Sequence, residues 1–337
     1  MSIREVENGK EIISIDASWL EAPKDFQGMY EVEYIPLETN DMALIGSIDD
    51  VKVMDGLFFL LDKSVAKALF IYNENGSFIN KIEAKGQGPD EVNRINDFTI
   101  NRDRKELMIS DLGRRRVFIY DFDGTLLRVE RNELWFTSVE WLSGDSYLYY
   151  YSHYSVDENR GQFGPLIVVG NINGKVEAEY FKIDNRPSNL TVVENFNFSN
   201  NGNEVLFSKK FDENLYSVNN QGQLVSKVKV DFGRLGIAKD YREFKVKDYR
   251  IFENENPFAQ VRSAYSTDSS YAISYTNPVK MNGLQIYMQA FISKNTTEGY
   301  LYLPTNNPDS DGDGYNDSVD VDWDNDGIKN DDEMPFN

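Results

Sequence analysis

Residues 71–79 read Ile-Tyr-Asn-Glu-Asn-Gly-Ser-Phe-Ile, and similar stretches occur at three further places: residues 119–127, 169–177 and 216–225. Each stretch has apolar residues, then a turn rich in Asn or Asp that ends in Gly, then a second strand-like run. Because Gly and Asn tolerate the positive φ that tight turns need, the pattern predicts a β-hairpin at each place. A weaker fifth copy ends at Gly299, after a longer connection through residues 231–257.

The spacing of these hairpins is nearly constant, because the turn glycines lie 48, 50 and 48 residues apart, at Gly76, Gly124, Gly174 and Gly222. Two more strand candidates precede each hairpin, and in the first two repeats they are Ile48–Val53, Leu57–Leu61, Phe98–Asn101 and Leu107–Ser110. Four short strands in a repeat of about 40 to 50 residues are typical of β-propeller blades. The sequence therefore predicts an all-β propeller of five to six four-stranded blades. A β-sandwich with recurring turns is the alternative.

The expected organisation has three parts: a lead-in segment at residues 1–30, the propeller at residues 31–303 and an acidic tail at residues 304–337. A strand at Glu31–Leu37 could complete the last blade, and Lys239–Phe252 could hold a short helix.

The composition excludes several classes of protein. The chain has 337 residues, no cysteine, one histidine and a formal net charge of −21. Without cysteine there is no disulfide framework, Cys-ligated zinc site or cysteine nucleophile. Such an acidic balance argues against a protein that coats nucleic acid or an anionic membrane. No apolar stretch of about 18 residues occurs, so no transmembrane segment is expected. The N-terminus also lacks a signal-peptide core.

About half of the net charge lies in the tail, where residues 305–337 hold eleven acids and one base. Within it, residues 309–320 and 322–333 each fit a calcium loop of about 12 residues, with oxygen ligands at alternate positions and Gly at the sixth. The predicted ligands, two of them through backbone carbonyls, are Asp309, Asp311, Asp313, Tyr315, Asp317, Asp320, Asp322, Asp324, Asp326, Ile328, Asn330 and Glu333. A solvated acidic tail without metal is the alternative.

Three motifs of the body carry a resemblance to a known family. They are Tyr34-Ile-Pro-Leu-Glu-Thr39, Leu44-Ile-Gly-Ser47 and Lys85-Gly-Gln-Gly-Pro-Asp-Glu91. Over about residues 30–303 the chain resembles NHL-like six-bladed β-propeller proteins, although Asp90 replaces the last Gly of the family's Gly-x-Gly-Pro-Gly-Glu motif. The resemblance implies an exported, sometimes lipid-anchored propeller with no established catalytic residues. The family's sixth blade would follow residue 303, where this chain turns acidic.

The tail resembles thrombospondin type 3 repeats over about residues 305–333. The second loop starts 13 residues after the first, which leaves no room for the paired helices of EF-hands. The resemblance implies that the carboxylates wrap several Ca²⁺ ions and that the metal folds the segment. Such modules need the calcium levels found outside cells, so we expect an exported protein whose signal sequence is absent from this chain.

Candidate ligand residues follow two short runs. Tyr147, Tyr149 and Tyr151 share one face of a predicted strand, where they either pack in the core or form a stacking platform for a sugar or peptide. Arg114 and Arg116 share a face as well, either at a solvated edge or as an anion site.

Catalysis has few candidates in this chain. His153 is the only histidine, so a Ser-His-Asp triad would have to use it, although it more naturally packs in its aromatic strand or lines the rim. No local signature singles out a pair of carboxylates for glycoside chemistry.

The sequence thus favours an extracytoplasmic binding module, in the periplasm or on the cell surface, for a glycan, peptide or protein ligand. A calcium-dependent hydrolase or lyase acting in the propeller channel and a structural spacer without a small ligand are the alternatives.

Overall fold

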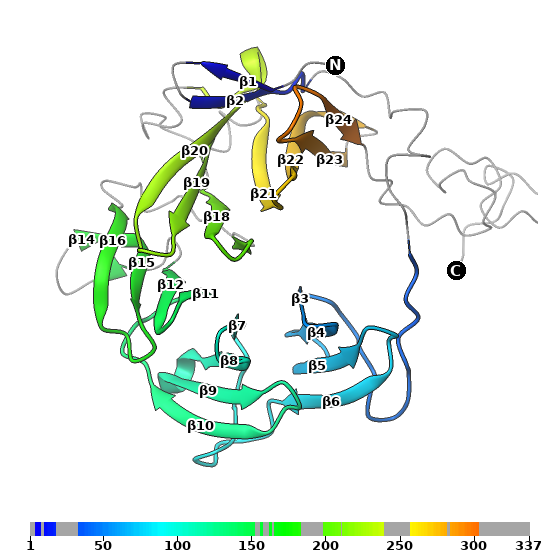
Figure 1. The fold of residues 1–337 in the computed structure, drawn as a ribbon, viewed down its shortest axis with the longest axis vertical. Helices are drawn as coiled ribbons and strands as arrows, with labels where there is room; N and C mark the ends of the chain where they lie inside the picture. Colours follow the sequence, from blue (N-terminus) through cyan, green and yellow to red (C-terminus); the bar gives the residue numbers. More distant parts are fainter. Residues whose placement is uncertain are drawn as a thin grey trace, which may run out of the picture.

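The computed structural model describes residues 4–7, 10–17, 33–151, 156–157, 162–163, 165–182, 198–209, 211–238, 257–281 and 284–302 of the chain. In these residues the strands form five successive blades around a common centre (Figure 1). Each blade has four antiparallel strands, so the all-β propeller prediction is confirmed with five blades. A sixth blade after residue 303 would lie outside the described residues.

The blades follow the chain in order, and in each the first strand lies innermost and the last outermost (Figure 1). Their strands are, for blade 1, β3 (Asp50–Met54), β4 (Leu57–Asp62), β5 (Ala68–Asn73) and β6 (Phe78–Glu83); for blade 2, β7 (Asp97–Asn101), β8 (Glu106–Asp111), β9 (Arg116–Asp121) and β10 (Leu126–Arg131); for blade 3, β11 (Ser138–Ser143), β12 (Ser146–Tyr150), β15 (Pro165–Asn171) and β16 (Val176–Lys182). Blade 4 has β17 (Ser199–Asn200), β18 (Glu204–Ser208), β19 (Asn214–Asn219) and β20 (Leu224–Asp231), and blade 5 has β21 (Gln260–Ser266), β22 (Ser270–Met281), β23 (Leu284–Ser293) and β24 (Gly299–Tyr302).

Three smaller features complete the described elements. Two short strands, β13 (Val156–Asp157) and β14 (Gln162–Phe163), pair with each other beside blade 3. Two 3₁₀ turns follow strands β8 and β20, at Leu112–Arg114 and Gly233–Leu235.

The four predicted hairpin turns share one local device. In blade 1, Oδ1 of Asn73 accepts hydrogen bonds from the backbone N–H groups of Asn75 and Ser77, and Gly76 adopts a φ of +79°. The same two bonds to an Asn or Asp carboxamide or carboxylate oxygen recur in blades 2, 3 and 4, at Asp121, Asn171 and Asn219. The prediction of these hairpins is confirmed. The fifth copy differs, because Gly299 begins β24 after a longer connection rather than closing a tight turn.

Apolar clusters join each blade to the next. Burying one large apolar side chain contributes roughly 1.5–3 kcal/mol, so these interfaces hold the ring together. The clusters contain, between blades 1 and 2, Phe59, Ile71, Phe98 and Phe118; between 2 and 3, Met108, Ile119, Trp141 and Tyr149; between 3 and 4, Leu148, Ile167, Val205 and Val218; and between 4 and 5, Leu215, Val230, Ile273 and Met288. A fifth cluster covers the flank of blade 1 with residues 37–45 instead of another blade.

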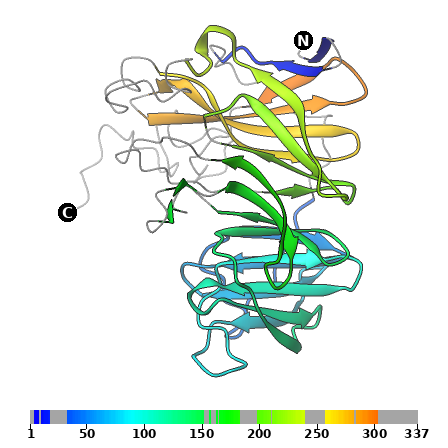
Figure 2. The same cartoon turned by 90° about the vertical axis from the view of Figure 1, so that its left-hand side faces the viewer.

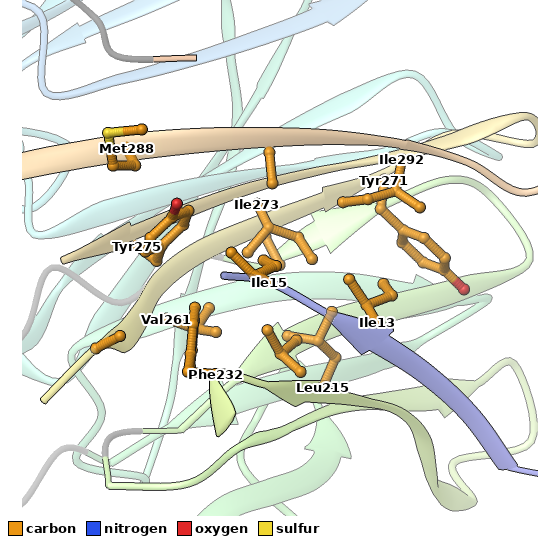
Figure 3. Close-up of a cluster of buried hydrophobic side chains, with 14 of the residues drawn as sticks. Ile13, Ile15, Leu215, Phe232, Val261, Tyr271, Ile273, Tyr275, Met288 and Ile292 are labelled. Carbon is orange, nitrogen blue, oxygen red and sulfur yellow. The ribbon is translucent and has the colours of Figure 1, made fainter. Parts of the chain in front are cut away.

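The N-terminus contributes a hairpin to blade 4. Strand β1 (Arg4–Glu7) pairs with β2 (Lys10–Ser14), and β2 pairs in parallel with β20, outside the four strands of the blade. Ile13 and Ile15 extend from this segment into the cluster between blades 4 and 5 (Figure 3). In the side view the blue N-terminal strands accordingly lie at the same end as the last blade (Figure 2).

The strand predicted at Glu31–Leu37 is wrong for residues 33–37, which form no strand. Instead, the N–H of Glu38 donates to the carbonyl of Gly76 at 2.8 Å, so this segment crosses the β5–β6 turn. In blade 2 the corresponding turn is contacted by the outer strand of blade 1, where Asn80 donates to the carbonyl of Asp123 at 2.7 Å. Residues 33–39 therefore contact the β5–β6 turn at the position where the outer strand of a preceding blade would lie, but they do not pair as a strand.

The helix predicted at Lys239–Phe252 and the predicted calcium loops lie outside the described residues. Within the described part, no helix is long and apolar enough to cross a membrane.

Candidate functional site

The innermost strands of four blades meet at the carboxylate of Glu140, on β11. Glu140 is 3% exposed. Its Oε2 accepts a hydrogen bond from Nζ of Lys52 on β3 at 2.6 Å. Its Oε1 accepts from Oγ1 of Thr99 on β7 and from Nδ2 of Asn200 on β17, each at 3.1 Å. This single carboxylate therefore connects blades 1, 2, 3 and 4 at their inner edges.

Lys52 is held in its charged form by the acids around it. Burial alone would lower the pKa of Lys52, but attraction to Glu140, Asp50 and Asp97 outweighs this effect and raises the pKa above its ordinary value of 10.5. The second nearest acid is Asp50, whose Oδ2 lies 3.8 Å from Nζ.

Asp97, on β7, makes a second connection across the blades. Its Oδ2 accepts from the backbone N–H of Val139 on β11 at 2.8 Å, and its Oδ1 lies 3.6 Å from Nζ of Lys63. Burial raises the pKa of Asp97 to about 6, although Lys63 and Lys52 pull it down. Lys52, Asp97 and Glu140 form a central cluster, and both of its carboxylates thus accept hydrogen bonds from donors of the protein. Among the described residues, no group of three His, Asp or Glu side chains is placed to hold a metal.

A surface cavity of about 500 Å³ lies beside blade 2, and we call it the arginine cavity. It is lined by Pro89, Arg114, Arg115, Arg116, Val129, Glu130 and Arg131. These residues come from the loop before β7, the 3₁₀ turn after β8 and the facing ends of β9 and β10. The structure thus brings Arg114 and Arg116, predicted as a candidate pair, to one cavity.

Both of these arginines are fixed on backbone carbonyls of the loop at residues 86–91. Arg114 donates from Nη1 to the carbonyls of Gly88 and Glu91, each at 3.0 Å, and from Nη2 to Gln87 at 3.0 Å. Arg116 donates from Nη1 to the carbonyl of Pro89 at 2.9 Å. Carbonyl partners hold the guanidinium groups in place without neutralising their charge.

The loop itself is folded by Glu91, whose Oε2 accepts from the N–H of Gly88 at 2.9 Å. A Cβ at Gly86 would stand 2.4 Å from the same oxygen, so a larger residue there would displace the carboxylate of Glu91 from its place in the loop. The motif therefore works as a structural turn that presents its carbonyls to the arginines.

The cavity gathers more positive than negative charge. In the described part of the chain, neither Arg114 nor Arg116 forms an ion pair with an acid, whereas Arg131 and Arg115 share Glu133 at 2.6 and 3.8 Å. Arg116 and Arg131 are also direct cross-strand partners in the β9–β10 ladder. Like charges at directly opposite positions destabilise a sheet. The planar fork of arginine donors suits carboxylate, sulfate and phosphate groups.

The other predicted ligand residues do not join this cavity. Tyr147 and Tyr149 are 1% and 0% exposed, in the core between blades 2 and 3, so the core-packing alternative holds for them and a stacking platform is not available there. Tyr151 is half-buried against the same cluster, and burial raises its pKa to about 12. His153 and the predicted calcium ligands from Asp309 to Glu333 lie outside the described residues.

Sequence reasoning missed the central cluster of Lys52, Asp97 and Glu140. The signal available was weak, since each is a polar residue at an inward position of an otherwise apolar strand, as in Val51-Lys-Val53. It also missed Pro89 and Arg131 as neighbours of the arginine run.

The four-stranded blades lie around a common centre, and Glu140 links the inner strands of four of them. This arrangement defines an all-β propeller. The chain belongs to the family described as Domain of unknown function (DUF4934), whose model matches residues 27–328. Among curated proteins, none matches this chain.

Two solved structures from Bacteroides illustrate the likeness. A "putative exported protein" of Bacteroides fragilis NCTC 9343 is 17% identical, with a TM-score of 0.68, over 87% of this chain and 80% of the other. A member of the DUF4221 family from Bacteroides vulgatus ATCC 8482 is 11% identical, with a TM-score of 0.48, over 76% of this chain and 80% of the other. The first of these supports the propeller fold.

Proposed function

We propose that the chain is an extracytoplasmic propeller that binds a glycan, peptide or protein ligand. The arginine cavity carries this proposal. Its volume of about 500 Å³ lies in the range of ligand sites, roughly 300–1,000 Å³. Its lining offers guanidinium donors together with the apolar surfaces of Pro89 and Val129, which suit binding. The lining has a single carboxylate, Glu130, and no Ser, Cys, Lys or His, so it lacks the paired groups that catalysis usually needs and fits binding better.

The extracytoplasmic location rests on three kinds of support. The motifs at residues 34–39 and 85–91 resemble those of exported propellers, and one protein of similar fold is described as exported. The acidic tail adds a third argument, because its loops would require calcium levels typical of the outside of cells.

We also propose that the tail binds Ca²⁺ through the two loops at residues 309–320 and 322–333. The donor set fits this ion, since carboxylate and carbonyl oxygens recur at alternate positions around Gly314 and Gly327. Bound Ca²⁺ would neutralise part of the −10 carried by residues 305–337 and so relieve the repulsion among its acids.

Calorimetry tests the calcium part. Chelator-treated full-length protein is expected to release or absorb heat on addition of millimolar Ca²⁺, and the Asp311→Ala, Asp324→Ala double variant is expected to lose most of it. Absence of any heat from the parent protein would refute the calcium loops.

Glycan and peptide arrays, probed with and without calcium, test the binding part. The full chain is expected to retain a defined set of ligands on one of the arrays. A chain that retains no glycan, peptide or protein under either condition is a spacer and not a binding module.

A further inference from the structure

We propose that the arginine cavity recognises the oxyanion group, carboxylate or sulfate, of an acidic saccharide. This inference rests on the proposed binding function and names the class of ligand for the cavity. It is carried by the placement of Arg114, Arg116 and Arg131 around one opening.

The charge of the cavity favours an anionic ligand. The whole chain carries a net charge of −21, yet the cavity lining has four arginines and one glutamate. Within the described residues, the guanidinium groups of Arg114 and Arg116 have carbonyl partners and no acidic partner. Positive charge that the protein leaves uncompensated is available to an anionic ligand.

The arginines are also preorganised for binding. The guanidinium group of Arg114 is held by three backbone carbonyls, so binding does not have to immobilise a free side chain. Arg116 is anchored on Pro89 through Nη1, and a guanidinium has about five N–H donors in all. Its fork therefore retains donors that a bidentate oxyanion can accept.

The pairing of Arg116 with Arg131 places two like charges directly opposite each other in the β9–β10 ladder, where they repel. Glu133, 2.6 Å from Nε of Arg131, offsets part of this repulsion, whereas Arg116 has no acidic partner among the described residues. An anion beside Arg116 would supply the missing attractive contact. Such a local conflict is expected at a ligand site.

The shape of the site favours a saccharide over a peptide. Arginine clusters also bind acidic peptide motifs, so charge alone does not separate the two classes of ligand. The cavity lies at the end of a strand pair, where a compact ring-shaped group fits better than an extended chain. The apolar surfaces of Pro89 and Val129 can cover a sugar face while the arginines bind its acidic group.

The test measures affinity of the full-length protein for uronate-containing and sulfated oligosaccharides, for their neutral counterparts and for acidic peptides. Arg116→Gln and Arg131→Gln each remove one charge from the cavity. Arg234→Gln removes the same charge from an exposed position after blade 4 and serves as the control. Thermal unfolding of each variant verifies that it folds. Arg114 is left intact because it holds the loop at residues 86–91.

The expected result is that acidic saccharides bind and neutral ones do not. Arg116→Gln and Arg131→Gln should each weaken binding about tenfold or more, as expected for a charged hydrogen bond, and high salt should weaken it as well. Arg234→Gln should leave affinity unchanged.

Other outcomes overturn the inference in distinguishable ways. Equal binding of neutral saccharides, or full affinity in Arg116→Gln and Arg131→Gln, refutes the oxyanion site while the binding function stands. Binding of acidic peptides alone refutes the saccharide class. Failure of every probe, on these panels and on the arrays, refutes the binding function itself.

Discussion

Replacing Glu140 by Gln removes the negative charge from the point where blades 1 to 4 meet. The side chain keeps its length and one acceptor oxygen, so its bonds with Thr99 and Asn200 can be retained in part. Nζ of Lys52 loses the carboxylate that lies 2.6 Å away and keeps Asp50, at 3.8 Å, and the more distant Asp97. The variant therefore removes the ion pair while it keeps a side chain of the same size at residue 140.

The expected loss of stability in Glu140→Gln follows from the burial of the ion pair. Removing one partner of a buried ion pair costs about 3–5 kcal/mol, because the other charge stays buried without compensation. The side chain of Lys52 is 19% exposed and that of Glu140 is 5% exposed, so water relieves a small part of this cost. We expect Glu140→Gln to lower the free energy of unfolding by about 3 kcal/mol. Because the folded-state pKa of Lys52 is raised above 10.5, its contribution is complete below pH 10.5 and is lost only as pH rises beyond that value.

Urea unfolding near neutral pH, followed by fluorescence and by circular dichroism, measures the effect; the two probes must coincide for a single free energy to apply. Lys52→Met and the Lys52→Met, Glu140→Gln double variant complete a double-mutant cycle. The double variant is expected to lose about 2 kcal/mol less stability than the sum of the losses in the two single variants. Glu74→Gln, at an exposed turn of blade 1, is the control and should change little. A coupling energy below about 0.5 kcal/mol between the two substitutions would show that the Lys52–Glu140 ion pair does not hold the blades together.

Two further predictions concern pH and the turns. Burial raises the pKa of Asp97 from 3.8 to about 6. The stability that this raised pKa contributes is complete below pH 3.8 and is lost as pH rises through 6, by about 3 kcal/mol in all. Asp97→Asn lacks this titration, so its stability relative to the parent should rise between pH 4 and pH 8; a constant difference would contradict the assignment. Gly76→Ala should lower the melting temperature more than Gly144→Ala, because both glycines have positive φ but a Cβ at residue 76 would stand 2.2 Å from the carbonyl oxygen of Pro36, whereas residue 144 has no neighbour within 4 Å. The expected cost is about 1–2 kcal/mol at residue 144 and at least about 2 kcal/mol more at residue 76, and equal losses would contradict the crowding argument.

The repeat could be predicted from the sequence because each hairpin turn is a local structure. Asn73 and Gly76 are three residues apart, and the bonds that form the turn reach no further than Ser77. The same short pattern recurs in three more blades, so its period revealed the length of one blade. The last blade was harder to recognise because the connection before β24 lacks this turn.

The candidate site was predictable only in part. Arg114 and Arg116 stand out as a basic run, and their position before a hairpin suggested a common face. Their partners were not predictable, because the carbonyls of Gln87 and Pro89 carry no side-chain signal and lie 27 residues earlier in the chain than the arginines they bind. The burial of Tyr147 and Tyr149 also depended on tertiary structure, since periodicity shows which residues share a face but not whether another blade covers that face.

The sequence alone determined the repeating hairpins of the blades and the absence of cysteine chemistry, since each depends on residues that are near in the chain or on simple composition. For the tail it supplies the prediction of calcium loops. Tertiary structure decided what lies at the centre and at the edges of the ring. Glu140 meets Lys52 across 88 residues, and β2 pairs with β20 across more than 200. Such contacts are set by how the blades are arranged around a common centre, which brings inner strands together irrespective of their distance in the chain.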